Sequence, residues 1–435
     1  MPFRSVFALS ILAVLAAPMA AQSRLGDEID RRVSQVMPQV VDWRRDIHQH
    51  PELSNREVRT ARLVAEHLTR LGLEVKTGVA HTGVVAVLRG GRPGPVVALR
   101  ADMDALPVTE QVDLPFKSTA RTEYNGQQVG VMHACGHDNH VAILMGVAEV
   151  LAGMRAQLPG TVKFIFQPAE EGPPLGEEGG APMMLKEGAF ETPKVDAIFG
   201  LHVFPREVGT VEYRSGGLMA SSDNFYITVR GRQTHGALPW NGIDPIVAAS
   251  QIVLGLQTLT SRQTDLTLTP AVVTVGMFRG GIRTNIVPDS VELAGTIRAF
   301  DEGVRADLHM RLTRTAESIA AASGATASVR IQKMTPVTFN NPALTERMVP
   351  TLQRVLGAPN VRLATPTTTA EDFSFFQEQV PGLFVFLGVT PKDQLATAAP
   401  NHSPRFQASE SALVPGMRLM ANLAVDYLAT GAVRQ

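Results

Sequence analysis

The sequence is poorest in cysteine, because Cys135 is the only one among 435 residues. A single cysteine excludes a disulfide within the chain. Cys135 is therefore a buried bystander, a reactive thiol, a metal ligand or half of an intermolecular bridge. It lies in the stretch VMHACGHDNH (131–140), among three histidines and one aspartate. This composition suggests a metal site, but zinc motifs usually carry paired cysteines, so a structural loop explains the stretch as well.

The sequence also lacks an excess of charge and, beyond its N-terminus, a long apolar run. Its 40 basic and 41 acidic residues almost cancel, which argues against nucleic acid or an anionic membrane surface as a partner. The N-terminus joins one basic residue to an apolar run (5–18) and then to small residues. This predicts a signal peptide over residues 1–21, although the usual spacing of small residues is not met, and hence a periplasmic or secreted protein. A membrane anchor is the alternative, but the run is shorter than the roughly 20 residues that span a bilayer.

Short apolar runs, bounded by turn residues, alternate with segments of helical periodicity. Such runs are typical of strands that are buried on both faces of a sheet. The alternation predicts an α/β fold with a largely parallel sheet. The expected strands lie within 83–90, 95–104, 161–168, 196–203 and 383–389, and the expected helices at 26–49, at 55–71 with Asn55 as N-cap, and at 138–153.

A different order of elements occupies residues 215–332. The pattern there predicts strand, helix, two strands, helix and strand, which is the split βαβ arrangement of a small α+β domain. We interpret it as a domain inserted into the α/β body, since such insertions are tolerated where chain ends lie close together. The body then comprises residues 22–214 and 333–435.

Polar side chains follow the predicted strands of the body at the points where the strands end. In open parallel sheets, ligand sites lie at the carboxyl ends of the strands. Each residue alone has an ordinary structural explanation, but four strand ends can bring their side chains into one crevice. Two adjacent carboxylates are costly unless a cation compensates, and a metal would take one and leave the other as a base. The residues are Asp102, Asp104, Glu170, Glu171, His202 and His402.

Several stretches, in order, carry a family resemblance. They include RRDIHQHPELSNREVRTA, ALRADMDALPVTE, MHACGHDNHVAILMG, FIFQPAEEG, GLHVFP, VRGRQTHGALPWNGIDPI, GGIRTNIVPDS and NHSPRF. Together the sequence resembles the binuclear metal-dependent amidohydrolases and carboxypeptidases of the aminoacylase type. Within them it is similar to the hippurate hydrolases and the plant auxin–amino-acid conjugate hydrolases. The resemblance covers residues 44–406, nearly the whole mature chain.

The resemblance implies a zinc-peptidase-like body with an inserted ferredoxin-like domain that serves as lid and homodimer interface. It implies two divalent cations per subunit, zinc or manganese, with cobalt or nickel as further options. Asp102 is a doubtful ligand, because many relatives carry a histidine at its position. The resemblance implies that two metal ions are bound by Cys135, His137, Glu171, His202 and His402. It implies that Glu170 is the general base and that Asp104 supports the metal ligands without binding the metal itself. His235 would stabilise the oxyanion in the partner's site, and Asn285 and Arg298 would bind the substrate carboxylate.

The implied activity is hydrolysis of the amide bond of N-acyl amino acids by metal-bound hydroxide, with Glu170 as base. A dipeptidase or carboxypeptidase with the same metals is a close alternative. A cysteine hydrolase, with Cys135 as nucleophile and His137 or His133 as base, belongs to another mechanistic class. A non-catalytic periplasmic protein that binds metal or ligand is the remaining alternative. The sequence does not predict which acyl group or amino acid is preferred.

Overall fold

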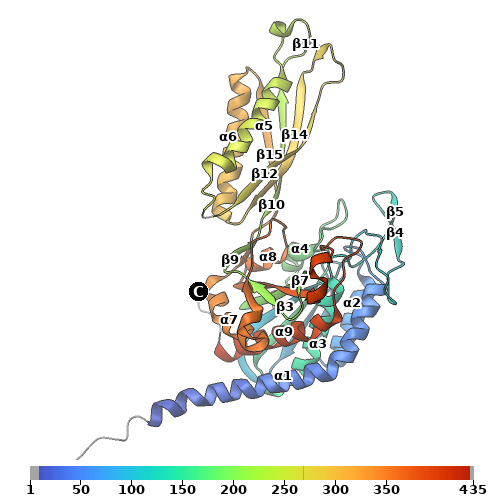
Figure 1. Ribbon diagram of the computed structural model, residues 1–435, viewed down its shortest axis with the longest axis vertical. Coiled ribbons are helices and arrows are strands. Elements are labelled where there is room, and N and C mark those ends of the chain that lie inside the picture. Colours follow the sequence, from blue (N-terminus) through green and yellow to red (C-terminus); the bar gives the residue numbers. More distant parts are fainter. Residues whose placement is uncertain (1–8, 268, 432–435) are drawn as a thin grey trace, which may run out of the picture. The chain divides into compact units, whose positions relative to one another are not determined.

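The computed structural model describes residues 9–267 and 269–431, with side chains from Leu25 onward. The first eight residues of the predicted signal peptide lie outside the described residues, and the side chains of its remainder are not described, so it stays a prediction. In the described part of the chain, no helix combines the length and apolar character needed to cross a bilayer. The chain forms two compact units (Figure 1), namely Met1–Ser215, Asn340–Ala364 and Phe376–Gln435 as unit 1, and Gly216–Phe339 and Thr365–Phe375 as unit 2.

Unit 1 is built on an eight-stranded sheet with the order β1-β2-β6-β3-β7-β18-β8-β17. Its four central strands, β6, β3, β7 and β18, run parallel to one another. All nine residues of β18 are buried, as expected for a strand covered on both faces. The predicted α/β fold with a largely parallel sheet is thus confirmed. The strands are β1 (Glu74–Val79), β2 (Gly83–Arg89), β3 (Arg92–Asp102), β6 (Pro159–Gln167), β7 (Ala197–Glu207), β8 (Val211–Tyr213), β17 (Val361–Leu363) and β18 (Gly382–Thr390).

Helices pack against this sheet and form one continuous core with it. α3 is buried along nearly its whole length and packs between α1 and α9. A short hairpin of β4 and β5 follows β3 in the chain. The bounds are α1 (Leu9–Gln49), α2 (Val58–Arg70), β4 (Arg121–Tyr124), β5 (Gln127–Gly130), α3 (His137–Ala152), α4 (Gly180–Lys186), α7 (Pro342–Leu356), α8 (Phe373–Gln377) and α9 (Leu413–Thr430).

The predicted N-cap of α2, Asn55, is wrong by two residues, because Glu57 occupies the N-cap position. Asn55 adopts a left-handed backbone conformation, with φ of +60°, and its side chain contacts Glu177 instead of capping the helix. The first turn is capped by Glu52, whose carboxylate accepts from the backbone N–H groups of Arg59 and Thr60 at 2.9 and 2.8 Å. The cap therefore comes from a residue six positions before the first helical residue, and a local pattern does not reveal it.

The main sheet of unit 2 and its two helices follow the predicted order of strand, helix, two strands, helix and strand, and short additional strands lie outside this sheet. The antiparallel main sheet has the strand order β12-β14-β10-β15, and α5 and α6 pack on it over a separate apolar core. Asp244 and Asp301 cap the two helices by accepting backbone N–H groups of the first turn. The elements are β9 (Gly216–Met219), β10 (Ser222–Arg230), β11 (Thr234–His235), α5 (Pro245–Gln263), β12 (Ala271–Gly280), β13 (Ile286–Val287), β14 (Ser290–Ala299), α6 (Glu302–Ala322), β15 (Thr326–Thr335) and β16 (Thr338–Asn340).

Candidate metal centre

The carboxyl ends of the central strands of unit 1 bring together side chains that are far apart in the sequence. β3 pairs with β7 only as far as Arg100 and Gly200, so the following residues of β7 extend beyond that pairing. A crevice at this edge is where parallel sheets bind ligands. Groups of potential ligand atoms that lie within 4.8 Å of one another cluster here, among them Cys135, His137 and His202; Cys135, Glu171 and His402; His137, Glu170 and Glu171; and Asp102, His137 and His140.

Cys135 connects two of these groups. Its Sγ lies 3.2 Å from Nε2 of His202 and 3.3 Å from Nε2 of His402. Gly136 turns the chain from Cys135 into α3 with φ of +90°, and a Cβ at this position would lie 2.4 Å from Val203. Only glycine fits there, which lets Cys135 and His137 point into the same cluster.

The histidines point ring nitrogens into this cluster. Nδ1 of His202 donates to the carbonyl oxygen of Val203 at 2.8 Å, which leaves Nε2 as the free acceptor beside Cys135. His137 is fully buried, and neither of its ring nitrogens makes a hydrogen bond to any described residue. Its Nδ1 lies 3.4 Å from Asp104, and its Nε2 lies 3.8 Å from Glu170. Metal-binding histidines typically direct their second nitrogen at a carbonyl or carboxylate in this way, so the residues fit a divalent cation.

His402 completes the cluster from the loop after β18. Its Nε2 lies 3.0 Å from Oε1 of Glu171. The backbone of His402 is left-handed, with φ of +68°, which is uncommon for a residue with a side chain. Asn401 anchors the loop by donating to the carbonyl oxygens of Cys135 and Val203, both at 3.1 Å. A strained residue held by its neighbours is characteristic of functional sites.

The electrostatics of the cluster favour a cation. Burial and the nearby carboxylates of Glu171 and Glu170 raise the pKa of Cys135 well above its ordinary value. Burial lowers the pKa of His137, but Asp102 and Asp104 outweigh burial and raise it to about 10. A nucleophilic cysteine requires a lowered thiol pKa, so these surroundings do not suit a cysteine hydrolase. They suit positive charge, which would stabilise thiolate and carboxylates together.

Asp102 and His140 form a hydrogen bond with each other beside the cluster. Asp102 accepts from Nη1 of Arg100 at 2.7 Å and from Nδ1 of His140, while Nε2 of His140 accepts from the backbone of Val203 at 2.9 Å. Burial would raise the pKa of Asp102, but Arg100, His137 and His140 lower it well below its ordinary value. Both residues are thus engaged as hydrogen-bonding partners. In the sequence, the only indication that His140 lies near the cluster is its position one helical turn after His137.

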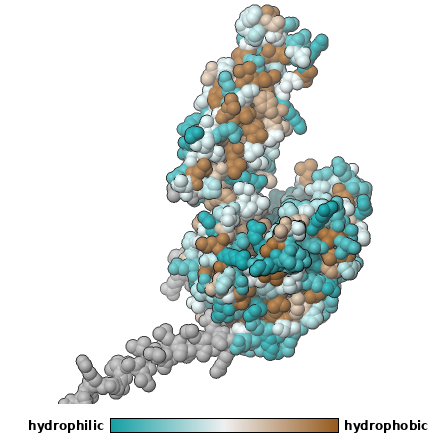
Figure 2. Space-filling view, in the orientation of Figure 1, coloured by the Kyte–Doolittle hydropathy of each residue, from teal (hydrophilic) through white to brown (hydrophobic). Residues whose placement is uncertain are grey.

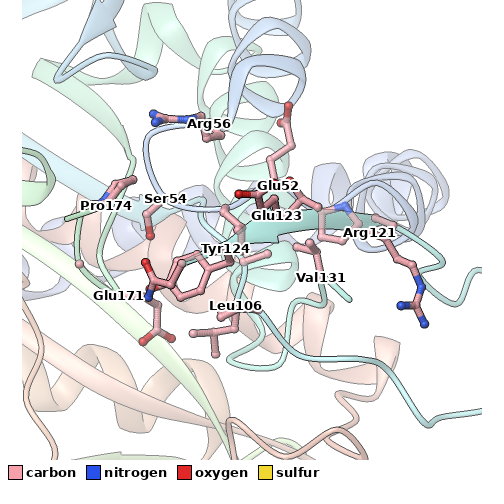
Figure 3. Close-up of a pocket in the computed structure, with 18 residues that line it drawn as sticks. Glu52, Ser54, Arg56, Leu106, Arg121, Glu123, Tyr124, Val131, Glu171 and Pro174 are labelled. Carbon is pink, nitrogen blue, oxygen red and sulfur yellow. The ribbon is translucent and has the colours of Figure 1, made fainter. Parts of the chain in front are cut away.

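A cavity of about 460 Å³ adjoins the cluster and is lined on one side by Glu171 (Figure 3). Apolar side chains from separate segments, among them Leu106 and Val131, form part of its wall, and Tyr124 reaches it from the β4–β5 hairpin. Because a cavity of about 150 Å³ already holds benzene, this one has room for a larger organic group.

The three residues that the resemblance assigns in unit 2 do not lie together. His235 and Asn285 are neighbours at the β11–β13 end, where the backbone of Gly236 donates to Asn285 at 2.8 Å. Arg298 lies at the other end of β14, about 26 Å from Ser290 at the usual rise per strand residue. Asn285 and Arg298 of one chain therefore cannot bind the same carboxylate.

Comparison with known proteins places this chain among metallohydrolases. Residues 98–426 match the model of peptidase family M20/M25/M40. The chain is 40% identical to thermostable carboxypeptidase 2 of Saccharolobus solfataricus, over 93% of this chain and 99% of that protein. It is also 40% identical to IAA-amino acid hydrolase ILR1-like 2 of Arabidopsis thaliana, over 90% of this chain and 86% of that protein. A dinuclear metal-binding M20 peptidase of Bacillus subtilis has a similar structure, with a TM-score of 0.76 and 36% identity over 91% of this chain and 99% of that one. The chain therefore belongs to peptidase family M20/M25/M40 and is a metal-dependent hydrolase of amide bonds.

Proposed function

We propose that the protein hydrolyses N-acyl amino acids with the help of two divalent cations. The observation that carries this proposal is the convergence of one thiol, three imidazoles and two adjacent carboxylates at one edge of the sheet. Soft sulfur and nitrogen ligands favour zinc, while the carboxylates also suit manganese, cobalt or nickel. The proposed ligands are Cys135, His137, Glu171, His202 and His402.

Glu170 is the proposed general base. When bound, the cations would polarise the amide carbonyl and lower the pKa of a water molecule. Glu170 takes the proton of the attacking water on its carboxylate and passes it to the nitrogen of the leaving amine. Asp104 holds the backbone of both glutamates, since its carboxylate accepts from their N–H groups at 3.1 and 3.0 Å.

We further propose that unit 2 acts as lid and homodimer interface. In a dimer, His235 and Asn285 of one subunit would act together with Arg298 of the other. Their separation within one chain would then not prevent them from binding the same substrate. Support comes from the edge strand β12 and from Val247 and Leu254, which are exposed and lie seven residues apart on α5. Figure 2 shows that hydrophobic side chains reach the surface of unit 2. His235 would stabilise the developing oxyanion, and Arg298 offers the planar donor pair that suits a carboxylate.

Hybrid dimers test this arrangement. Co-expression of His235→Ala with Glu170→Gln yields mixed dimers in which one of the two sites has both native residues. Random pairing should restore about a quarter of the native activity, because half of the dimers are mixed. If the mixture is as inactive as either variant alone, or if the native protein is an active monomer, His235 does not act in the partner's site.

The cavity beside Glu171 is the proposed site of the acyl group. This cavity belongs to unit 1. A panel of N-acyl amino acids and dipeptides, assayed with metal-reconstituted protein, tests the proposed function. Preference for dipeptides would favour the carboxypeptidase activity that one relative's name describes, and hydrolysis of neither class would contradict the proposal.

We also propose export, on the basis of the predicted signal peptide. N-terminal sequencing of the protein recovered from the periplasm or medium tests this, because a processed chain should begin near residue 22. A chain that retains its first residues inside the cell would contradict export.

A further inference from the structure

Glu57 has a buried carboxyl group that takes no part in capping its own helix. It occupies the N-cap position of α2, yet its side chain makes no capping hydrogen bond, and the N–H groups of the first turn are bonded to Glu52 instead. The side chain of Glu57 is fully buried. An acidic side chain is rarely placed so deep without a specific partner.

The partners of Glu57 lie on the segment that carries the proposed base. Its Oε1 accepts from the backbone N–H of Ala169 at 2.9 Å, and its Oε2 accepts from the hydroxyl of Thr82 at 2.5 Å. The next two N–H groups, of Glu170 and Glu171, are both bonded to Asp104. Three consecutive backbone donors are therefore held by the buried carboxyl groups of two residues that come from separate segments of the chain.

This segment needs to be held because its conformation is unfavourable by itself. Ala169 has φ of +53°, in the left-handed region that residues with a Cβ seldom adopt. The turn sets the directions of the two side chains that follow, which must differ because one is the proposed base and the other a proposed ligand. A small rotation at Ala169 would misplace both carboxylates, and catalytic groups tolerate little displacement.

We propose that Glu57 is a positioning residue, which fixes the turn at Ala169 and thereby the directions of the Glu170 and Glu171 side chains. Thr82 in turn fixes the carboxyl group of Glu57. The inference rests on the proposed roles of Glu170 and Glu171, but it concerns a residue outside the cluster. Its effect should appear in metal affinity through Glu171 and in kcat through Glu170.

The chemistry of the contacts indicates which substitutions the site tolerates. Burial and repulsion from Asp104 raise the pKa of Glu57 to about 8, so a neutral side chain suits the position. Glutamine keeps the length and an oxygen for the N–H of Ala169, and its amide group can donate to the hydroxyl of Thr82. Alanine leaves the N–H of Ala169 without its acceptor in a buried place.

The test compares Glu57→Ala, Glu57→Gln and Thr82→Val in the full-length protein. For Glu57→Ala we expect kcat at saturating metal to fall about 10- to 100-fold with a KM near the native value, and affinity for zinc to weaken to a similar degree. Glu57→Gln should stay within about threefold of native in both measurements, and Thr82→Val should lie between the two. Zinc affinity is measured by competition with a chromophoric chelator, so it does not depend on turnover.

Thr351→Val is the matched control. Thr351 also donates to a buried carboxylate, that of Asp426 at 2.6 Å, but it lies on α7. This variant should lower the melting temperature while kcat and zinc affinity stay native. The inference is overturned if Glu57→Ala keeps native kcat and zinc affinity, or if Glu57→Gln loses as much as Glu57→Ala. If Glu57→Ala does not fold, Glu57→Gln and Thr82→Val decide, and equal losses in Thr82→Val and Thr351→Val would reduce Glu57 to a purely structural residue. If the native protein hydrolyses no N-acyl amino acid, the proposed function fails, while the zinc measurements still test Glu57.

Discussion

Replacement of Glu170 by glutamine separates the chemistry of this residue from its contribution to the fold. The two side chains have the same shape, and Asp104 holds the backbone N–H of residue 170 at 3.1 Å in either case. The variant loses the proton acceptor and its negative charge but keeps the length and shape of the side chain. A positioned general base contributes about 10²- to 10⁴-fold, or about 3–5 kcal/mol at 1.36 kcal/mol for each factor of ten. We therefore expect kcat to fall by this factor, with native metal content.

The assay measures kcat on an N-acyl amino acid and metal content by mass spectrometry in the same preparations. Glu171→Gln is the matched control, because the neighbouring carboxylate lies 3.0 Å from His402 and is a proposed ligand. It should lose metal and activity together. A Glu170→Gln variant with a near-native rate, or two variants that lose metal equally, would refute the assignment of different roles to the two glutamates.

The remaining predictions concern a ligand, the cavity and unit 2. Cys135→Ser should weaken metal affinity and activity in parallel, and full metal content at native affinity would leave Cys135 as a bystander. Tyr124→Ala should lower kcat/KM for aromatic acyl groups about tenfold relative to acetyl, because an apolar contact is lost, and an unchanged ratio would exclude Tyr124 from the acyl site. Asp223→Asn should destabilise the folded state by about 3–5 kcal/mol at neutral pH, because Arg305 and His309 are left with a neutral partner. Burial raises the pKa of Asp223, but the hydrogen bonds from Arg305 and His309 and the charge of Arg305 lower it overall. Because the pKa of Asp223 is lower in the folded than in the unfolded state, its ionised carboxylate stabilises the fold at pH values above about 3.9, the pKa of an aspartate in the unfolded chain. This stabilisation is lost as the pH falls from there toward the pKa of the folded state. The difference in melting temperature between native and variant should therefore shrink from pH 7 to pH 3, and a constant difference would contradict the ion-pair origin.

The sequence predicts the elements of the fold because their signals are local. Buried parallel strands read as short apolar runs, and β2 and β18 lie within one residue of the expected segments. The polar residues directly after these runs share an edge of the sheet because parallel strands all end on the same side. Asp104, Glu170 and His202 could therefore be expected near one another without any knowledge of distances.

The contacts behind the site could not be predicted, because they join segments that are far apart in the chain. Glu57 reaches Ala169 across 112 residues, and Asn401 reaches Cys135 across 266. The conformation of His402 likewise depends on its surroundings, since a positive φ is uncommon for any residue with a side chain. Such residues look like ordinary polar surface until the fold is known.

Metal removal tests the central claim most directly. The purified protein should contain two divalent ions per chain, lose hydrolysis of N-acyl amino acids on exhaustive treatment with a chelator, and regain it with zinc or manganese. Full activity in a preparation shown by mass spectrometry to be free of divalent metal would contradict the account, because then the cluster around Cys135 would not be a catalytic metal site.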